Sequence, residues 1–177
     1  MKRLGIIWGC LAIIGHAEPA YAQSEHPVQL ALLNPVQLFS DTDAIRGVRF
    51  SLLYGKNTAV SGFDLGLVNH TTDAFRGVQF GGVGVSNGDF TGWQNNWVNV
   101  VQGAFEGLQI GVVSTAETGR GVQWSGVNHS RNFRGLQVAV VNYARQLDGV
   151  QIGLINIIRE GGMFPVFPIV NWSRGAN

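Results

Sequence analysis

The chain repeats one short pattern of hydrophobic and polar residues along almost its whole length. Each copy begins with Gly and continues as apolar, Gln, apolar, small, apolar, Val and Asn, followed by six or seven variable residues. A fixed short period of this kind is typical of repeat architectures. The glycines that begin the eight clearest copies are spaced 14 or 15 residues apart; they are Gly47, Gly62, Gly77, Gly92, Gly107, Gly121, Gly135 and Gly149.

Two less regular copies flank these eight. Residues 27–34 fit the pattern with Pro27 in place of Gly, and residues 164–171 fit it at the other end. We therefore expect about ten copies in a single domain over 23–177, with 27–34 and 164–171 as degenerate capping repeats. Proline cannot donate to a β-ladder, so prolines at both ends would protect the exposed strand edges.

Within each copy, apolar and polar residues alternate as they do in a β-strand that buries one face. In the last regular copy, Val150, Ile152 and Leu154 share one face, and Gln151 lies on the other. Because apolar side chains are ordinarily buried, we expect the apolar face to form the core and the glutamines to point outward. A second apolar position, two residues before each Gly and occupied for example by Phe75, predicts another short side of the coil.

Two all-β architectures fit this pattern. In a β-solenoid each copy is one coil, whereas in a small up-and-down β-barrel each copy is one strand. The recurring Asn and the uniformly short connections favour a β-solenoid of about ten 14–15-residue repeats, because stacked Asn side chains can hydrogen-bond along a ladder. The low charge, the glycine content and an end that carries Pro165, Phe167 and Trp172 keep the barrel as the alternative.

The repeats that begin at Gly107, Gly135 and Gly149 resemble those of a family of bacterial exported surface-repeat proteins. The opening at residues 27–37 and the closing Gly-Gly-Met-Phe-Pro-Val-Phe-Pro-Ile-Val-Asn-Trp at residues 161–172 are similar too. The resemblance covers nearly all of the chain after residue 22. It implies export and a repeat architecture, and it brings no active site with it.

The first residues have the features of a secretory signal peptide. Lys2 and Arg3 precede an apolar stretch over residues 4–15, and Ala-Tyr-Ala at residues 20–22 predicts cleavage before Gln23. The one cysteine, Cys10, lies inside the apolar stretch and not at its end, so the pattern does not indicate a lipoprotein. We therefore expect residues 1–22 to be a signal peptide and the protein to reach the periplasm, the cell surface or the outer membrane.

Composition narrows the function classes. The chain has 25 glycines among 177 residues and 13% charged residues, against about 7% glycine and about 25% charged residues in a typical soluble domain. Beyond residue 22 there are ten basic and ten acidic residues, so no basic excess is available for binding nucleic acid. Disordered chains are polar and highly charged, so the low charge excludes a disordered protein. A single cysteine cannot build a disulfide scaffold.

One copy departs from the pattern and supplies the candidate binding site. In Gly92-Trp-Gln-Asn-Asn-Trp, Asn95 takes a position that is apolar elsewhere, and Trp93 and Trp97 flank it. If that position belongs to the core, Asn95 must find buried partners. We single out Trp93, Asn95 and Trp97 as the candidate binding residues.

No other residue set predicts chemistry. His70 and His129 both follow the repeat Asn, but four coils would separate them by about 19 Å, too far to share a metal. Carboxylates such as Asp64 are scattered without a spacing that indicates an acid and base pair. We therefore expect no catalytic, cofactor-binding or metal-binding residues. Arginines that precede the repeat glycine would form a stripe interrupted by Glu106 and Asp148; they are Arg46, Arg76, Arg120 and Arg134.

These observations predict a non-enzymatic exported repeat protein. It would act as a structural or interaction module of a bacterial envelope or surface, with a glycan or a surface protein as its partner. The alternative is a small outer-membrane barrel with a structural or pore-like role.

Overall fold

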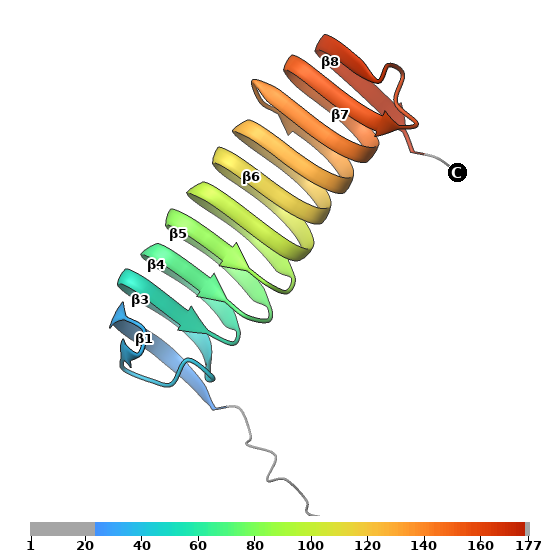
Figure 1. The fold of residues 1–177 in the computed structure, drawn as a ribbon. Coiled ribbons are helices and arrows are strands. Elements are labelled where there is room, and N and C mark those ends of the chain that lie inside the picture. The colour runs from blue at the N-terminus through green and yellow to red at the C-terminus, as the bar shows by residue number, and fades with distance from the viewer. Residues whose placement is uncertain (1–23, 176–177) are drawn as a thin grey trace, which may run out of the picture.

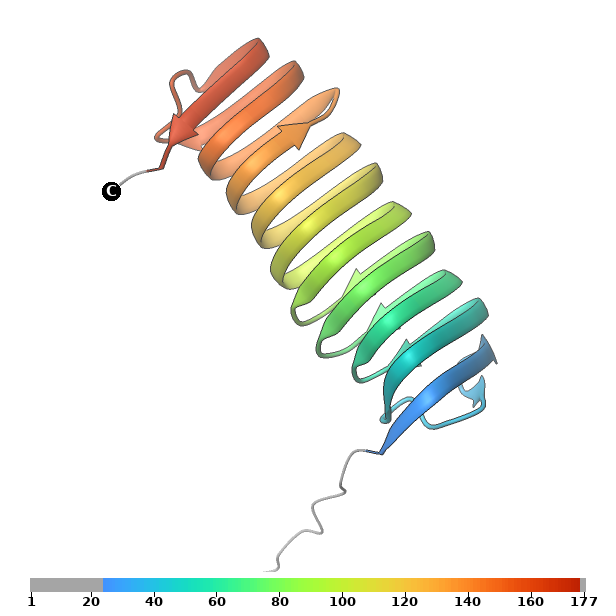
Figure 2. The same ribbon diagram turned by 180° about the vertical axis from the view of Figure 1, so that it is seen from behind.

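Parallel, in-register pairing of successive repeats builds the fold. In the computed structural model, which describes residues 24–175, the repeats form a β-solenoid of about nine coils (Figure 1). Coils spaced by about 4.8 Å make a rod roughly 43 Å long, and Figure 2 shows the same stack from behind. The solenoid prediction is confirmed, and the alternative barrel is wrong. The predicted signal peptide, residues 1–22, lies outside the described residues.

All strands belong to one sheet, in the order β2-β1-β3-β4-β5-β6-β7-β8. Equivalent residues stand beside one another, as Gly62 pairs with Gly77 and Gln79 pairs with Gln94. Strands β6 and β7 are long because they bend through successive coils without interruption. The bounds are β1 Glu25–Leu33, β2 Val36–Gln37, β3 Ala44–Asn57, β4 Val60–Thr71, β5 Phe75–Ser86, β6 Phe90–Val138, β7 Val141–Glu160 and β8 Val166–Arg174.

The two ends differ from the regular coils in strand direction. β1 pairs in parallel with β3, so residues 27–34 do form the first coil. β8 instead runs antiparallel to β7, and the short β2 runs antiparallel to β1. The expectation that 164–171 form a tenth copy of the coil is therefore wrong: this segment returns across the last coil, with Asn171 opposite Gln151 and Trp172 opposite Val150.

The repeat glycines are required by the backbone. All eight have φ between +129° and +152°, a region that residues with a side chain rarely adopt. A Cβ added to Gly107 would lie 1.9 Å from the carbonyl oxygen of Gly92 in the preceding coil, and the other repeat glycines meet the same obstacle. A close approach between successive coils therefore fixes glycine at the first position of the repeat.

The alternating faces are oriented opposite to the expectation from sequence. The repeat glutamines are buried, with exposed fractions of 0–1%, whereas Ile152 and Leu154 are 40% and 69% exposed. Gln151 thus points into the coil, and the apolar residues on either side of it point outward. The predicted outward-facing glutamines and the predicted apolar core at Val150, Ile152 and Leu154 are wrong.

Buried glutamines form a continuous ladder of side-chain hydrogen bonds. Each Nε2 donates to the Oε1 of the equivalent glutamine one coil earlier, from Gln151 to Gln137, Gln123, Gln109, Gln94 and Gln79, over 2.6–3.0 Å. Translation by one coil brings donor and acceptor together, so the amides within the ladder are hydrogen-bonded although they are buried. At its C-terminal end, the Oε1 of Gln151 is buried without a partner among the described residues. A shorter asparagine ladder runs beside it, where Asn128 donates to Asn142 and Asn142 donates to Asn156.

Apolar side chains fill the other half of the interior. The position two residues before the repeat Gly is buried, as predicted, and Phe75 stacks on Phe90 with ring centroids 4.6 Å apart. The interior therefore contains a polar column and an apolar column side by side. The apolar cluster consists of Ile45, Val60, Phe75, Phe90, Val101, Phe105, Ala116, Phe133, Ala144, Leu147 and Ile158.

We expect Gly107→Ala to destabilise the fold by about 4 kcal/mol or more, because both the positive φ and the carbonyl of Gly92 oppose a Cβ. Gly161→Ala is the matched control. Gly161 also has a positive φ, of 72°, but a Cβ there would meet only the hydroxyl of Ser173, at 3.8 Å, so we expect a loss of about 1 kcal/mol. Urea unfolding followed by circular dichroism measures both, and equal losses would contradict the close-approach argument.

We expect Gln109→Leu to cost about 2–5 kcal/mol, because it leaves the Nε2 of Gln123 and the Oε1 of Gln94 buried without their partners. Val112→Gln in the same coil is the control: Val112 is 60% exposed, so the free energy of unfolding should change by less than about 0.5 kcal/mol. Chemical denaturation compares the two. If the leucine variant is as stable as the parent, the buried ladder is wrong.

Candidate functional site

The outward-facing residues of the repeat form one continuous apolar surface. Counting the repeat glycine as position one, positions two, four, six and seven of every coil point outward. We call these positions, from 28 to 155, the apolar surface. Its most exposed large side chains are Val28, Leu30, Leu32, Leu33, Val48, Phe50, Leu52, Leu53, Phe63, Leu65, Leu67, Trp93, Trp97, Val112, Trp124, Val127, Val140, Ile152, Leu154 and Ile155.

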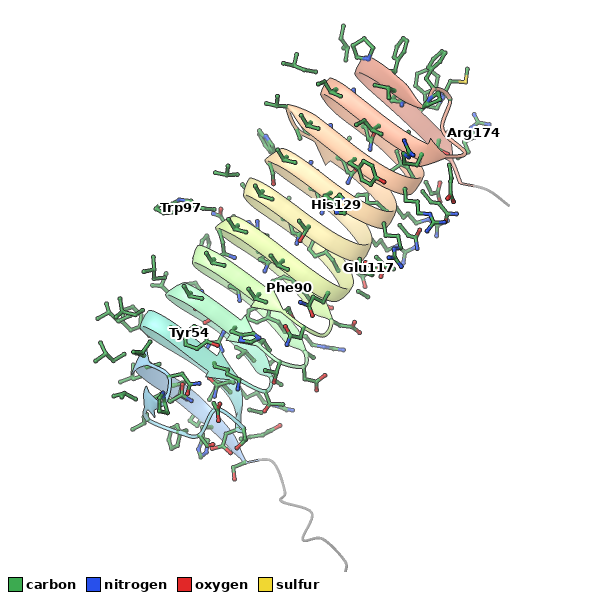
Figure 3. The ribbon with its side chains drawn as sticks, in the orientation of Figure 1. Tyr54, Phe90, Trp97, Glu117, His129 and Arg174 are labelled. Carbon is green, nitrogen blue, oxygen red and sulfur yellow. The ribbon has the colours of Figure 1, made fainter. Side chains whose placement is uncertain are left out.

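The apolar surface bends around one long edge of the rod. Positions two and four lie on one broad side. Positions six and seven are consecutive and both point outward, which places a corner there, between the inward residues at positions five and eight. Trp97, at position six, projects from the edge that is on the left in Figure 3. The apolar surface is therefore convex.

Not one of these positions carries a charged residue, and the only strongly polar side chain among them is Asn95. Most of the charged side chains of residues 24–175 gather along the opposite long edge, where Figure 3 labels Glu117. They neutralise one another across coils: Arg131 pairs with Glu117 at 2.8 Å, and Arg145 pairs with Glu160 at 2.7 Å. The rod thus has an apolar side and a mixed-charge edge.

The predicted binding residues all lie on the apolar surface. Trp93 is 38% exposed and Trp97 is 69% exposed, and Asn95 points outward between them. The expectation that Asn95 occupies a core position is wrong, because the neighbouring Asn96 is the buried one and donates to Gln79 and Asn99. The structure brings Trp93, Asn95 and Trp97 together on one coil, and their binding role stays a prediction.

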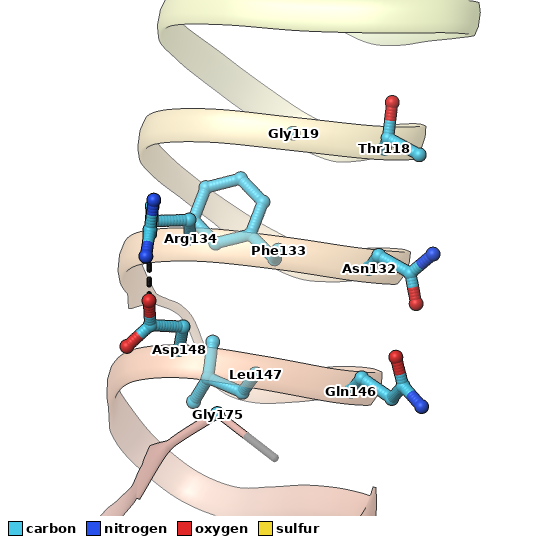
Figure 4. A pocket seen from close by; sticks show the side chains of 9 residues that line it. All are labelled: Thr118, Gly119, Asn132, Phe133, Arg134, Gln146, Leu147, Asp148 and Gly175. Carbon is cyan, nitrogen blue, oxygen red and sulfur yellow. Dashed lines mark hydrogen bonds and ion pairs between the residues drawn. The ribbon is translucent and has the colours of Figure 1, made fainter. Parts of the chain in front are cut away.

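Two of the hollows in the outer surface lie at the two sides just described. A shallow groove of about 450 Å³ lies on the apolar surface and is lined by Trp124, Ser125, Val138, Ala139, Val140, Ile152, Gly153, Leu154 and Ile169. A hollow of about 360 Å³ lies at the charged edge, over Phe133 and Leu147, and contains the ion pair between Arg134 and Asp148 at 2.6 Å (Figure 4). Gly119 lines this second hollow at a position where most other coils have a large apolar residue.

A buried ion pair that the sequence analysis missed ends the glutamine ladder. Gln79 donates to Oδ2 of Asp64, which in turn accepts from Nε and Nη2 of Arg49 over 2.7 Å. Both charged side chains are completely buried. From the sequence, Asp64 is only a carboxylate without the spacing of an acid and base pair, and no ion pair is expected there. The sequence signal of this ion pair is that Arg49 and Asp64 replace the repeat glutamine in two successive copies.

The histidines stay apart, as the spacing predicts. His70 contacts the hydroxyl of Tyr54 at 2.9 Å, and burial lowers the pKa of its imidazole. His129 stacks on Tyr143 with ring centroids 4.9 Å apart. Within residues 24–175 no group of three or more His, Cys, Asp or Glu side chains is placed to hold a metal ion.

The same part of the chain contains no helix long and apolar enough to cross a membrane. No family model, curated protein or solved structure matches the chain.

We expect Asp64→Asn to cost about 3–5 kcal/mol, because it leaves the buried guanidinium of Arg49 without a counter-charge. Replacing both Arg49 and Asp64 by Gln removes the charges and extends the ladder, so the double variant should recover most of that loss. Thermal unfolding of the parent, the single variant and the double variant gives the comparison. A double variant no more stable than Asp64→Asn would show that the ladder cannot pass through these two coils.

Proposed function

We propose that the protein is a non-enzymatic exported repeat protein that acts as a structural or interaction module of a bacterial envelope or surface, and that it associates through its apolar surface. The observation that supports this proposal is the absence of charge from positions two, four, six and seven in every coil. Large contiguous apolar patches on soluble proteins mark interaction sites. Here such a patch follows the whole rod.

The interior explains why this outer surface does not contribute to folding. Amide ladders and one column of apolar side chains already fill the coil. The outward apolar residues gain little from folding in water, since they stay exposed in the folded chain. A partner that buries these side chains would remove their apolar surface from water, and this burial would stabilise the complex. A glycan partner would have to contact Trp93 and Trp97, because the glutamines are out of its reach.

The proposal predicts that the purified protein is not a bare monomer in water. Without detergent it should form oligomers, and in dodecyl maltoside it should become a monomer that carries bound detergent. Light scattering coupled to size-exclusion chromatography measures both states.

Two variants sharpen this test. The apolar-surface variant carries Val112→Lys and Leu154→Lys, at positions that are 60% and 69% exposed, and it should be monomeric without detergent. The polar-edge variant carries Gln102→Lys and Thr118→Lys, also at exposed positions, and it should behave as the parent does. A parent protein that is monomeric in water and binds no detergent would refute the proposal.

A further inference from the structure

We infer that the partner of the apolar surface is a lipid bilayer, on which the rod lies lengthwise with its apolar side in the interfacial region and its charged edge in water. This inference rests on the proposed function and names the partner. It follows from the shape of the apolar surface, from the placement of charge and from the positions of the tryptophans.

Shape separates a lipid surface from a second copy of the chain. A second rod stacked on the broad side would cover positions two and four, as in a β-sandwich. It would leave the edge uncovered, where Val112, Val140 and Leu154 are 55–69% exposed. Lipid chains are fluid and can surround a convex surface, so one bilayer can cover the broad side and the edge together.

Backbone hydrogen bonding is compatible with a nonpolar medium. Backbone groups in the interior coils are paired with the coils before and after them, as in the register of β4 with β3 and β5. An apolar environment accepts only structures that satisfy their backbone internally. The broad side of a regular solenoid meets this condition, because unpaired strand edges occur only at its two ends.

Charge fixes the orientation of the rod. The charged edge runs along the rod in parallel to the apolar surface, as the ion pairs Glu25–Arg46 and Arg145–Glu160 in coils at opposite ends show. A rod that crossed the bilayer would carry this edge through the hydrocarbon, at high cost. A rod that lies along the surface keeps the edge in water. Since the ten basic and ten acidic residues beyond residue 22 balance, the attraction that we propose is hydrophobic and not electrostatic.

The tryptophans mark the same side. All four tryptophans in residues 24–175 are partly exposed. Trp93, Trp97 and Trp124 belong to the apolar surface. Trp172 lies opposite Val150, which occupies position two of its coil, and so it lies on the same broad side. The large aromatic residues of the interior are phenylalanines. Trp has an apolar ring system with one polar N–H, and it is enriched where lipid meets water.

The test uses the chain from Gln23, the form that the predicted cleavage leaves, so that the apolar residues 4–15 cannot bind lipid themselves and the tryptophans that fluoresce are the four of the described residues. Vesicles of phosphatidylcholine, with and without bromine on the acyl chains, are added at low and at high salt. We expect brominated vesicles to quench the tryptophans, and we expect binding to persist at high salt because it is not electrostatic.

Matched variants in the same background assign the effect to the surface. The apolar-surface variant should bind and be quenched with at least about tenfold lower affinity, since each lysine must leave water. The polar-edge variant should match the parent. Circular dichroism confirms that both variants keep the fold. Equal quenching of the parent and the apolar-surface variant would overturn the assignment to this surface.

The remaining outcomes separate this inference from the proposed function. If the parent is not quenched but forms a stable dimer that the apolar-surface variant abolishes, the partner is a second copy: the lipid inference fails and the proposed function stands. If the parent is neither quenched nor associated in water, both fail.

Discussion

In the ladder from Gln94 to Gln151, each buried glutamine donates its side-chain N–H to the glutamine of the preceding coil, and the rest of the coil depends on this bond. The bond forms only when successive coils are in register and close together. That spacing in turn requires the repeat glycines, because a Cβ at Gly107 would strike the carbonyl of Gly92. Where the ladder ends, Asp64 accepts the last donor, and Arg49 balances its charge.

A polar interior leaves the apolar residues of the same strands outside. Side chains alternate along a strand, so burying Gln151 exposes Ile152. The coil is stabilised from within by amide hydrogen bonds and by one column of apolar side chains that includes Phe75 and Phe90. Its outer hydrophobic side is left to contact something else. The alternation of side chains between the two faces of the strand therefore accounts for both the fold and the proposed association.

The sequence predicts the repeat, the strands and the solenoid, because these follow from spacing. It does not predict directly which face is inside, since a period of two defines two faces without ranking them. The sequence does contain one signal of the orientation. Phe75, Gln79 and Gly81 are separated by even numbers of residues, so they share one face of the strand. If the phenylalanine is buried, the glutamine is therefore inside as well. The antiparallel β8 could not be predicted, because residues 164–171 end in Ile-Val-Asn and so resemble the regular, parallel copies.

The candidate site depends on the same orientation. The sequence identifies Trp93 and Trp97 because their copy departs from the repeat pattern. It does not show that they lie within a continuous apolar surface. The apolar surface becomes visible only when the glutamines are placed inside.

The orientation of the glutamines can be measured in the unmodified protein. Side-chain amide hydrogen exchange by NMR compares the ladder glutamines, such as Gln109 and Gln123, with Gln102, which is exposed. We predict strong protection of the ladder amides and fast exchange at Gln102. Exchange of the ladder amides at the rate of Gln102 would contradict this orientation.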